Sequence, residues 1–269
     1  MSAINIRVMF CKTTKRAALL LLLATITTAC SDSHDATPDS FLPAVKTQEA
    51  TARPVSTVQQ PSPAAEMSAF AFPGQIDPTK RYLFYLHGRI IEDQGIRAVS
   101  PRYGAYEYRE ILEEFQRHGF VVISEHRGQN TDPYLYATRI VRQVESLLNS
   151  GVPEGNVTIV GASKGAVIAI FVSHLLEIQN INYVIIAICT PDVREELIES
   201  NVSLSGNVLS IYDSIDEFAG SCEELFILSQ GEAFGKHDEI VLDLGLGHGM
   251  LYHAMDEWML PVLQWTGMQ

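Results

Sequence analysis

The sequence predicts an α/β fold, with a doubly wound, mostly parallel sheet of about six strands and helices on both faces. From residue 81 onward, short runs of β-branched and aromatic residues alternate with helical patterns, which is typical of successive βα units. The strand segments also read as nearly continuous apolar runs, as expected for strands that helices cover on both sides. Together these two observations indicate a parallel sheet between two layers of helices.

Each apolar run gives one expected element. The chain has 269 residues, 46% of them hydrophobic, which is enough for one core of this size. The expected strands are Tyr82–His87, Phe120–His126, Val157–Gly161, Tyr183–Cys189, Val208–Asp213 and Ile240–Leu244. The expected helices are Gly104–His118, Pro133–Asn149, Lys164–Gln179, Val193–Ser200, Cys222–Gln230 and Met250–Gln264.

The N-terminal segment has the features of an export signal. Residues 1–16 hold four basic residues and no acid, and the apolar run Ala17–Ala29 ends at Cys30. The exit at residues 26–30 resembles the bacterial lipoprotein signal, which implies that residues 1–29 are removed and that Cys30 is lipidated. Because Thr27 stands where that motif prefers Leu, ordinary secretion with a free Cys30 is the alternative.

The segment that follows predicts a flexible spacer. Residues 30–66 are rich in Ser, Thr, Ala, Pro, Asp and Gln, so they cannot bury enough surface to offset chain entropy. The folded domain is therefore expected over residues 67–269. The formal net charge is −13, and removal of residues 1–29 makes it −17. Such a surface disfavours nucleic acid and anionic lipid head groups, so an acyl chain alone would hold the protein to a membrane on the outside of the cell or in its envelope.

A candidate nucleophile lies between the third expected strand and its helix. Residues 161–165 read Gly-Ala-Ser-Lys-Gly, a G-x-S-x-G pattern in the strand-turn-helix context of a nucleophile elbow. Small residues at 161 and 165 let strand and helix approach closely, and the tight turn exposes the hydroxyl of Ser163. The other interpretation is an ordinary glycine-rich βα turn.

A serine hydroxyl needs a base, and His248 is the candidate. It lies between two glycines just after the last expected strand, where the carboxyl ends of the strands gather reactive residues. His253 is expected inside the last helix and His237 before the last strand, so we interpret both as surface or loop residues. His248 is therefore the predicted partner of Ser163.

The base needs a carboxylate that holds its tautomer. Asp216 follows the fifth expected strand by three residues and is the first choice, with Asp213 as the main competitor. Asp192 is interpreted as a helix N-cap. The order along the chain is then Ser163, Asp216, His248.

The backbone N–H groups of Arg89 and Lys164 are the candidate oxyanion donors. Lys164 follows the nucleophile directly, and Arg89 belongs to the loop after the first strand, where Gly88 permits close approach of the backbone. His87 is interpreted as a residue that holds this loop in place.

These residues together resemble the α/β-hydrolase superfamily over roughly residues 81–266. The resemblance implies an acyl-enzyme mechanism on an ester, thioester or amide, with no metal and no cofactor. The chain lacks the long insertion that forms a cap domain in many relatives, so we expect no large cap domain and a pocket that is open or covered only by the loop Arg89–Tyr103. The first hypothesis is a lipid-anchored serine hydrolase that cleaves a small ester.

Several alternatives stay open. A thioesterase or a peptidase would use the same residues, and the fold could instead serve as a non-catalytic binding module of the cell envelope. Basic residues near the expected site would suit a carboxylate-bearing substrate, or would pair with the acids that lie equally near in sequence. Cys189 and Cys222 are expected near one end of the sheet, as a disulfide or as two buried thiols.

Overall fold

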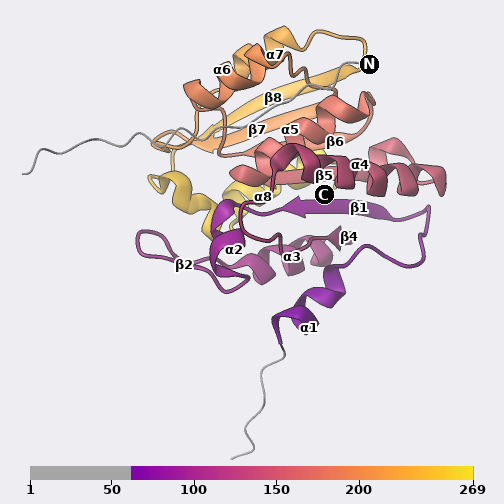
Figure 1. The fold of residues 1–269 in the computed structure, drawn as a ribbon, viewed down its shortest axis with the longest axis horizontal. Helices are drawn as coiled ribbons and strands as arrows, with labels where there is room; N and C mark the ends of the chain where they lie inside the picture. The colour runs from indigo at the N-terminus through magenta and orange to yellow at the C-terminus, as the bar shows by residue number, and fades with distance from the viewer. Residues whose placement is uncertain (1–61, 269) are drawn as a thin grey trace, which may run out of the picture. The chain divides into compact units, whose positions relative to one another are not determined.

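The computed structural model describes residues 62–268, and its centre is a six-stranded sheet in which all neighbouring strands are parallel (Figure 1). The strand order is β4-β1-β5-β6-β7-β8. The strands are β1 Arg81–Leu86, β4 Phe120–Ile123, β5 Val157–Ala162, β6 Asn182–Ile186, β7 Gly206–Asp213 and β8 Phe234–Leu242. The doubly wound parallel sheet predicted from the sequence is confirmed.

Helices cover both faces of this sheet. Alternate strand residues point to opposite sides, so Tyr82 and Phe84 join one apolar core while Leu83 and Tyr85 join the other. The first core is closed by α4 Pro133–Asn149, α5 Lys164–Leu176, α6 Pro191–Glu199 and α7 Glu223–Leu228. The second is closed by α2 Arg89–Gln94, α3 Tyr108–Arg117, the 3₁₀ helix η3 Gly247–Tyr252 and α8 Asp256–Trp265.

The segment expected as a loop over the site contains regular structure. Helix α2 follows β1 after two residues, and a two-stranded antiparallel ribbon follows it, formed by β2 Val99–Ser100 and β3 Gly104–Ala105. The helix expected from Gly104 therefore begins four residues later, at Tyr108. A short 3₁₀ helix, η2 Glu154–Asn156, precedes β5.

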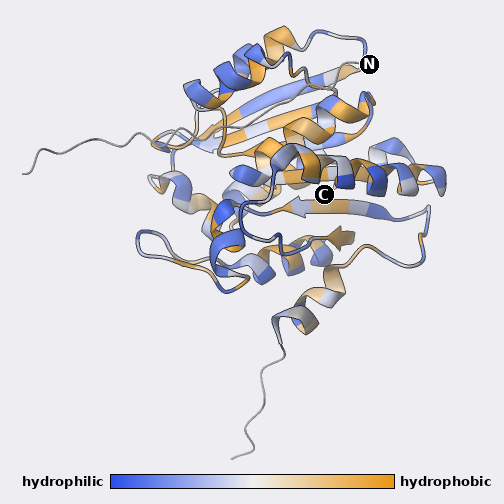
Figure 2. Ribbon diagram, in the orientation of Figure 1, coloured by the Kyte–Doolittle hydropathy of each residue, from blue (hydrophilic) through white to orange (hydrophobic). Residues whose placement is uncertain are grey.

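The last strand begins earlier than expected, at Phe234 instead of Ile240. It is an edge strand, and none of its nine residues is fully buried, so its first half has the polar composition of a surface segment. Figure 2 shows β8 as hydrophilic beside the apolar strands of the sheet. His237 consequently lies within this strand and not before it.

The expected helix Met250–Gln264 is two elements. Residues 247–252 form η3, and α8 begins at Asp256 after an extended backbone at His253 and Met255. His253 therefore stands between two helices and not inside one.

The N-terminal predictions concern residues that the structure largely does not describe. The export signal, Cys30 and the spacer up to residue 61 lie outside residues 62–268. The final spacer residues instead begin a short helix, α1 Pro63–Met67, which Ser62 caps, followed by η1 Ser68–Phe70. Within the described part of the chain, no helix combines the length and apolarity needed to cross a bilayer.

Candidate active site

Ser163 lies in a strained turn between β5 and α5. Its φ of 52° and ψ of −119° are rare for a residue with a side chain, and its N–H donates to Ile186 O at 2.9 Å, which holds the turn against β6. A Cβ on Gly161 would come within 2.3 Å of Gly165 O, and a Cβ on Gly165 within 1.8 Å of Leu86 O. The small residues of the G-x-S-x-G pattern are therefore required by the close contact of β5, α5 and β1.

His248 joins this serine to a carboxylate. Its Nε2 lies 3.0 Å from Ser163 Oγ and its Nδ1 lies 2.9 Å from Asp216 Oδ2. An ionised carboxylate can only accept hydrogen bonds, so Nδ1 of His248 carries the proton. Nε2 is then free to accept a hydrogen bond from the hydroxyl of Ser163. The ring of Phe218 packs edge-on against the imidazole, with centroids 5.4 Å apart. The structure thus brings together all three residues that were predicted from positions 53 and 32 residues apart in the chain.

Asp216 and Asp213 have different contacts. The Asp216 side chain is completely buried, and its second oxygen, Oδ1, accepts the N–H of Phe218 at 2.8 Å. Asp213, also buried, accepts the N–H groups of Ile215, Leu244 and Leu246 at 3.1, 3.1 and 3.3 Å. Asp213 therefore ties together the two loops that carry Asp216 and His248, while Asp216 contacts the imidazole itself.

The two predicted oxyanion donors are the first residues of α2 and α5. Within residues 62–268, neither the Arg89 N–H nor the Lys164 N–H has a backbone or side-chain acceptor, as expected at a helix start. A Cβ on Gly88 would lie 3.6 Å from Ser163 Cβ, so the β1–α2 turn lies directly against the serine. The geometry leaves both N–H groups available beside Ser163.

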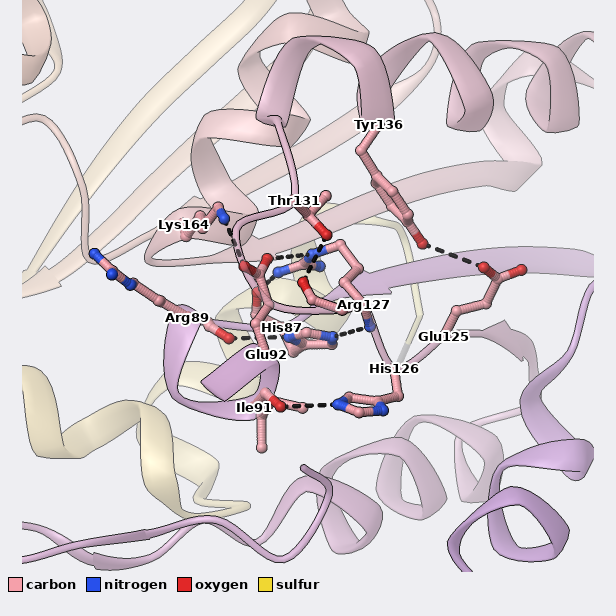
Figure 3. Close-up of polar contacts among 12 residues, drawn as sticks. His87, Arg89, Ile91, Glu92, Glu125, His126, Arg127, Thr131, Tyr136 and Lys164 are labelled. Carbon is pink, nitrogen blue, oxygen red and sulfur yellow. Dashed lines mark hydrogen bonds and ion pairs between the residues drawn. The ribbon is translucent and has the colours of Figure 1, made fainter. Parts of the chain in front are cut away.

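His87 holds the β1–α2 turn, as the sequence indicated. Its Nδ1–H donates to Gly88 O at 2.9 Å, and its Nε2 accepts the N–H of Arg127 at 3.0 Å (Figure 3). Burial lowers the pKa of His87 well below its ordinary value, and the positive charge of Arg127 lowers it further. A neutral imidazole with one donor and one acceptor fits both contacts.

The basic residues near the site are all paired with acids. This observation favours the second interpretation from the sequence, in which the cations pair with neighbouring carboxylates instead of awaiting an anionic substrate. The pairs are Arg89 with Asp93, Arg97 with Glu66, Arg102 with Glu217, and both Arg127 and Lys164 with Glu92. Glu92 is one of the acids that the sequence places near these cations, but the sequence did not indicate that this one carboxylate pairs with both Arg127 and Lys164.

A cavity of about 340 Å³ opens beside His248. Two exposed apolar side chains, Ile215 and Leu246, stand on its wall, and Tyr103 packs against Gly249 there. The wall also holds Arg102, Glu217, Gly245, Gly247 and His253. The Nδ1 atom of His253 lies 3.1 Å from Oε1 of Glu107. The cavity therefore lies next to the imidazole edge of the site and is partly apolar.

Cys189 and Cys222 form a disulfide, which resolves the open question about these two thiols. Their Cα atoms are 5.3 Å apart, and both residues are fully buried. The bond joins the loop after β6 to the residue just before α7, six residues beyond Asp216. Among the described residues, no group of three or more His, Cys, Asp or Glu side chains is arranged to hold a metal ion.

No protein family and no curated protein matches this sequence. Among solved structures, SOBER1 of Arabidopsis thaliana aligns with a TM-score of 0.44 and 10% identity, over 70% of this chain and 98% of that chain. The thioesterase RedJ of Streptomyces coelicolor aligns with a TM-score of 0.41 and 14% identity, over 80% and 91% of the two chains. The butyrate-bound esterase Est2 of Thermogutta terrifontis aligns with a TM-score of 0.41 and 13% identity, over 72% and 84%. Similarities of this size do not transfer an activity, so what this chain does must follow from its own residues.

Proposed function

We propose that this protein is a serine hydrolase of the α/β-hydrolase type that cleaves a small carboxylic ester through an acyl-enzyme intermediate. The observation that carries the proposal is the chain of contacts from Ser163 Oγ to His248 Nε2, 3.0 Å, and from His248 Nδ1 to Asp216 Oδ2, 2.9 Å. Serine, histidine and aspartate in this geometry form the general machinery of acyl transfer.

Each group has a defined role in the proposed reaction. Ser163 Oγ attacks the ester carbonyl while its proton passes to His248 Nε2, and Asp216 stabilises the imidazolium that results. The developing oxyanion accepts hydrogen bonds from the backbone N–H groups of Arg89 and Lys164. Collapse of the tetrahedral intermediate breaks the C–O bond, and His248 returns its proton to the leaving alcohol. Water, activated by the same histidine, then releases the acid and restores Ser163.

The cavity beside His248 is the proposed site of the leaving group. Because His248 protonates the departing alcohol, that part of the substrate has to lie on the imidazole side of Ser163. The apolar walls of Ile215 and Leu246 favour an alcohol with an apolar portion, whereas the paired cations offer no free charge for a carboxylate. The apolar wall and the paired cations therefore support a neutral ester as the substrate.

A fluorophosphonate probe tests this proposal directly. The wild-type protein should be labelled and should hydrolyse an aryl ester, while Ser163→Ala should do neither; Ser150→Ala, at the exposed end of α4, serves as the matched control. A panel of an ester, a thioester and an amide with the same acyl group then ranks esterase, thioesterase and peptidase. An unlabelled wild-type protein would favour a non-catalytic envelope module.

We further propose that the protein is exported and anchored through Cys30. The basic and apolar segments before Cys30 support export, and the Cys189–Cys222 disulfide supports an oxidising compartment, since such bonds persist there and are rare in the cytosol. Fractionation of cells that express Cys30→Ser tests the anchor. We expect the variant to leave the membrane fraction and the wild type to remain in it.

A further inference from the structure

Glu92 is a buried carboxylate that accepts from two cations. Its side chain has no exposed surface; Oε1 accepts from Arg127 Nε at 2.9 Å, and Oε2 lies 2.5 Å from Lys164 Nζ (Figure 3). The Arg127 side chain is buried as well, and that of Lys164 is mostly buried. A buried carboxylate is tolerated only when its oxygens are paired in this way, so the three side chains form one unit.

The three residues come from separate parts of the fold. Glu92 belongs to the first turn of α2, Arg127 to the loop after β4, and Lys164 to the first position of α5. Arg127 and Lys164 are 35 and 72 residues from Glu92 along the chain. The ion pairs therefore tie the start of α2 to the start of α5.

These two helix starts carry the proposed oxyanion donors. Lys164 supplies one N–H and, through its side chain, one end of the bridge to Glu92. Arg89 supplies the other N–H and lies three residues before Glu92 in the same helix. Arg127 adds a second tie, since its guanidinium donates to His87 O and its backbone N–H donates to His87 Nε2. Glu92 thus lies in the same helix as the Arg89 N–H, and the other end of the network, Lys164, carries the second N–H itself.

We propose that Glu92 is a positioning residue which, through Lys164 and Arg127, fixes the separation and direction of the Arg89 and Lys164 N–H groups. This inference rests on the proposed hydrolase function. Glu92 itself does not touch the substrate. Preorganised donors stabilise an oxyanion because they need no rearrangement as the charge develops, so loosening their spacing lowers kcat more than it changes KM.

Two substitutions test the bridge from its two ends. Glu92→Gln keeps the shape and an oxygen for Arg127, but it presents an amide to the Lys164 ammonium. Lys164→Met removes the ammonium, keeps the backbone N–H and leaves the Glu92–Arg127 pair intact, so it remains informative if Glu92→Gln does not fold. We expect each to lower kcat by about 10- to 100-fold with KM changed by less than about threefold.

Three further variants separate positioning from simple stabilisation. Lys164→Arg retains a cation for Glu92 and should restore kcat to within about threefold of wild type. Glu113→Gln removes an exposed ion pair with Arg109 on α3 and should leave kcat unchanged. The double variant Glu92→Gln/Lys164→Met should have the same kcat as the less active of the two single variants, because both substitutions break the same bridge.

The readout has to be the rate per active site. Fluorophosphonate titration counts the reactive serines, and kcat is normalised to that count, so a loss of folded protein does not appear as a loss of rate. A trifluoromethyl ketone, whose serine adduct carries an oxyanion, should bind more weakly to the variants in proportion to their loss of kcat/KM. A ground-state analogue that lacks an electrophilic carbonyl should bind them as it binds wild type.

The outcomes distinguish this inference from the proposed function. If wild type neither reacts with the probe nor hydrolyses esters, the hydrolase function fails and the role of Glu92 fails with it. If wild type is active and both single variants keep its normalised kcat, only the role of Glu92 is overturned. A parallel loss of affinity for both analogues would also overturn it, since that result indicates a general disturbance of the pocket.

Discussion

The Oδ2 atom of Asp216 lies 2.9 Å from Nδ1 of His248, whereas Asp213, at the end of β7, binds three backbone N–H groups and no part of the imidazole. Two buried aspartates three residues apart thus have separate tasks. Asp216 contacts the imidazole of His248, and Asp213 orders the loops around it.

We predict opposite phenotypes for the two aspartates. Asp216→Asn should lower kcat by about 10⁴-fold with little change in thermal stability, because the amide favours the wrong imidazole tautomer. Asp213→Asn should keep kcat per titrated serine within about threefold, but it should lower the free energy of unfolding by about 1–3 kcal/mol through the loss of charge-assisted hydrogen bonds. Ester kinetics and urea denaturation of both variants decide the assignment, which an exchange of these two phenotypes would reverse.

The His87 imidazole predicts a pH-dependent loss of stability. Its folded pKa is well below the unfolded value of about 6.5, so below that pH the unfolded state takes up a proton that the folded state does not. The stabilising contribution is complete above about pH 6.5 and is lost as the pH falls toward the folded pKa, at up to about 1.4 kcal/mol per pH unit. Urea denaturation across this range should show the difference between wild type and His87→Gln shrinking as the pH falls. His174→Gln, on a partly exposed histidine, is the control, and a pH-independent difference for His87→Gln would contradict the prediction.

The cavity beside His248 predicts selectivity for the leaving group. Leu246→Ser removes apolar surface from its wall, so KM for esters of apolar alcohols should rise by about 3- to 10-fold, while methyl esters with the same acyl group should change little. Leu260→Ser on α8 is a matched control, since Leu260 is 43% exposed and Leu246 is 42% exposed. An equal rise in KM for both kinds of ester would show that the leaving group lies elsewhere.

The Cys189–Cys222 disulfide predicts sensitivity to reductant. The bond closes a loop with a sequence separation of 33 residues that includes Asp216. The chain-entropy model gives such a crosslink about 3–4 kcal/mol of stability. The Cys189→Ala/Cys222→Ala variant should therefore unfold at lower urea and should not respond to dithiothreitol, whereas the wild type with reductant should approach the variant. Identical midpoints for the wild type with and without reductant would contradict this.

The sequence located the candidate site because its strongest signals are local. Gly161, Ser163 and Gly165 lie within five consecutive residues, so their pattern is visible without the tertiary fold, and the glycines around His248 mark a loop at the end of the sheet. The structure was needed to decide between Asp213 and Asp216, because the sequence does not show which of the two carboxylates at the end of β7 faces His248. The sequence indicated that Glu92 could pair with a nearby cation, but it could not show that Arg127 and Lys164 share this carboxylate, because both approach it only through the tertiary fold.

The fold class was clear from periodicity, but several boundaries were not. The polar first half of β8 lacks the apolar run that identifies a buried strand. This strand lies at the edge of the sheet, where it pairs only with β7 and none of its residues is fully buried. The last expected helix is interrupted because His253 and Met255 adopt extended backbone before α8, where Ala254 and Met255 pack against the second core. Pro261 lies inside α8, where a helix interior normally disfavours it.

The two edges of the sheet bear on the behaviour of the protein at high local concentration. An exposed edge strand is a template on which another chain can add a strand and begin aggregation. Here one edge is β4, only four residues long, and the other is β8, which carries the charged residues Lys236, Asp238 and Glu239. Short length at one edge and charge at the other discourage intermolecular strand pairing, so copies crowded on a surface would be expected to remain separate molecules.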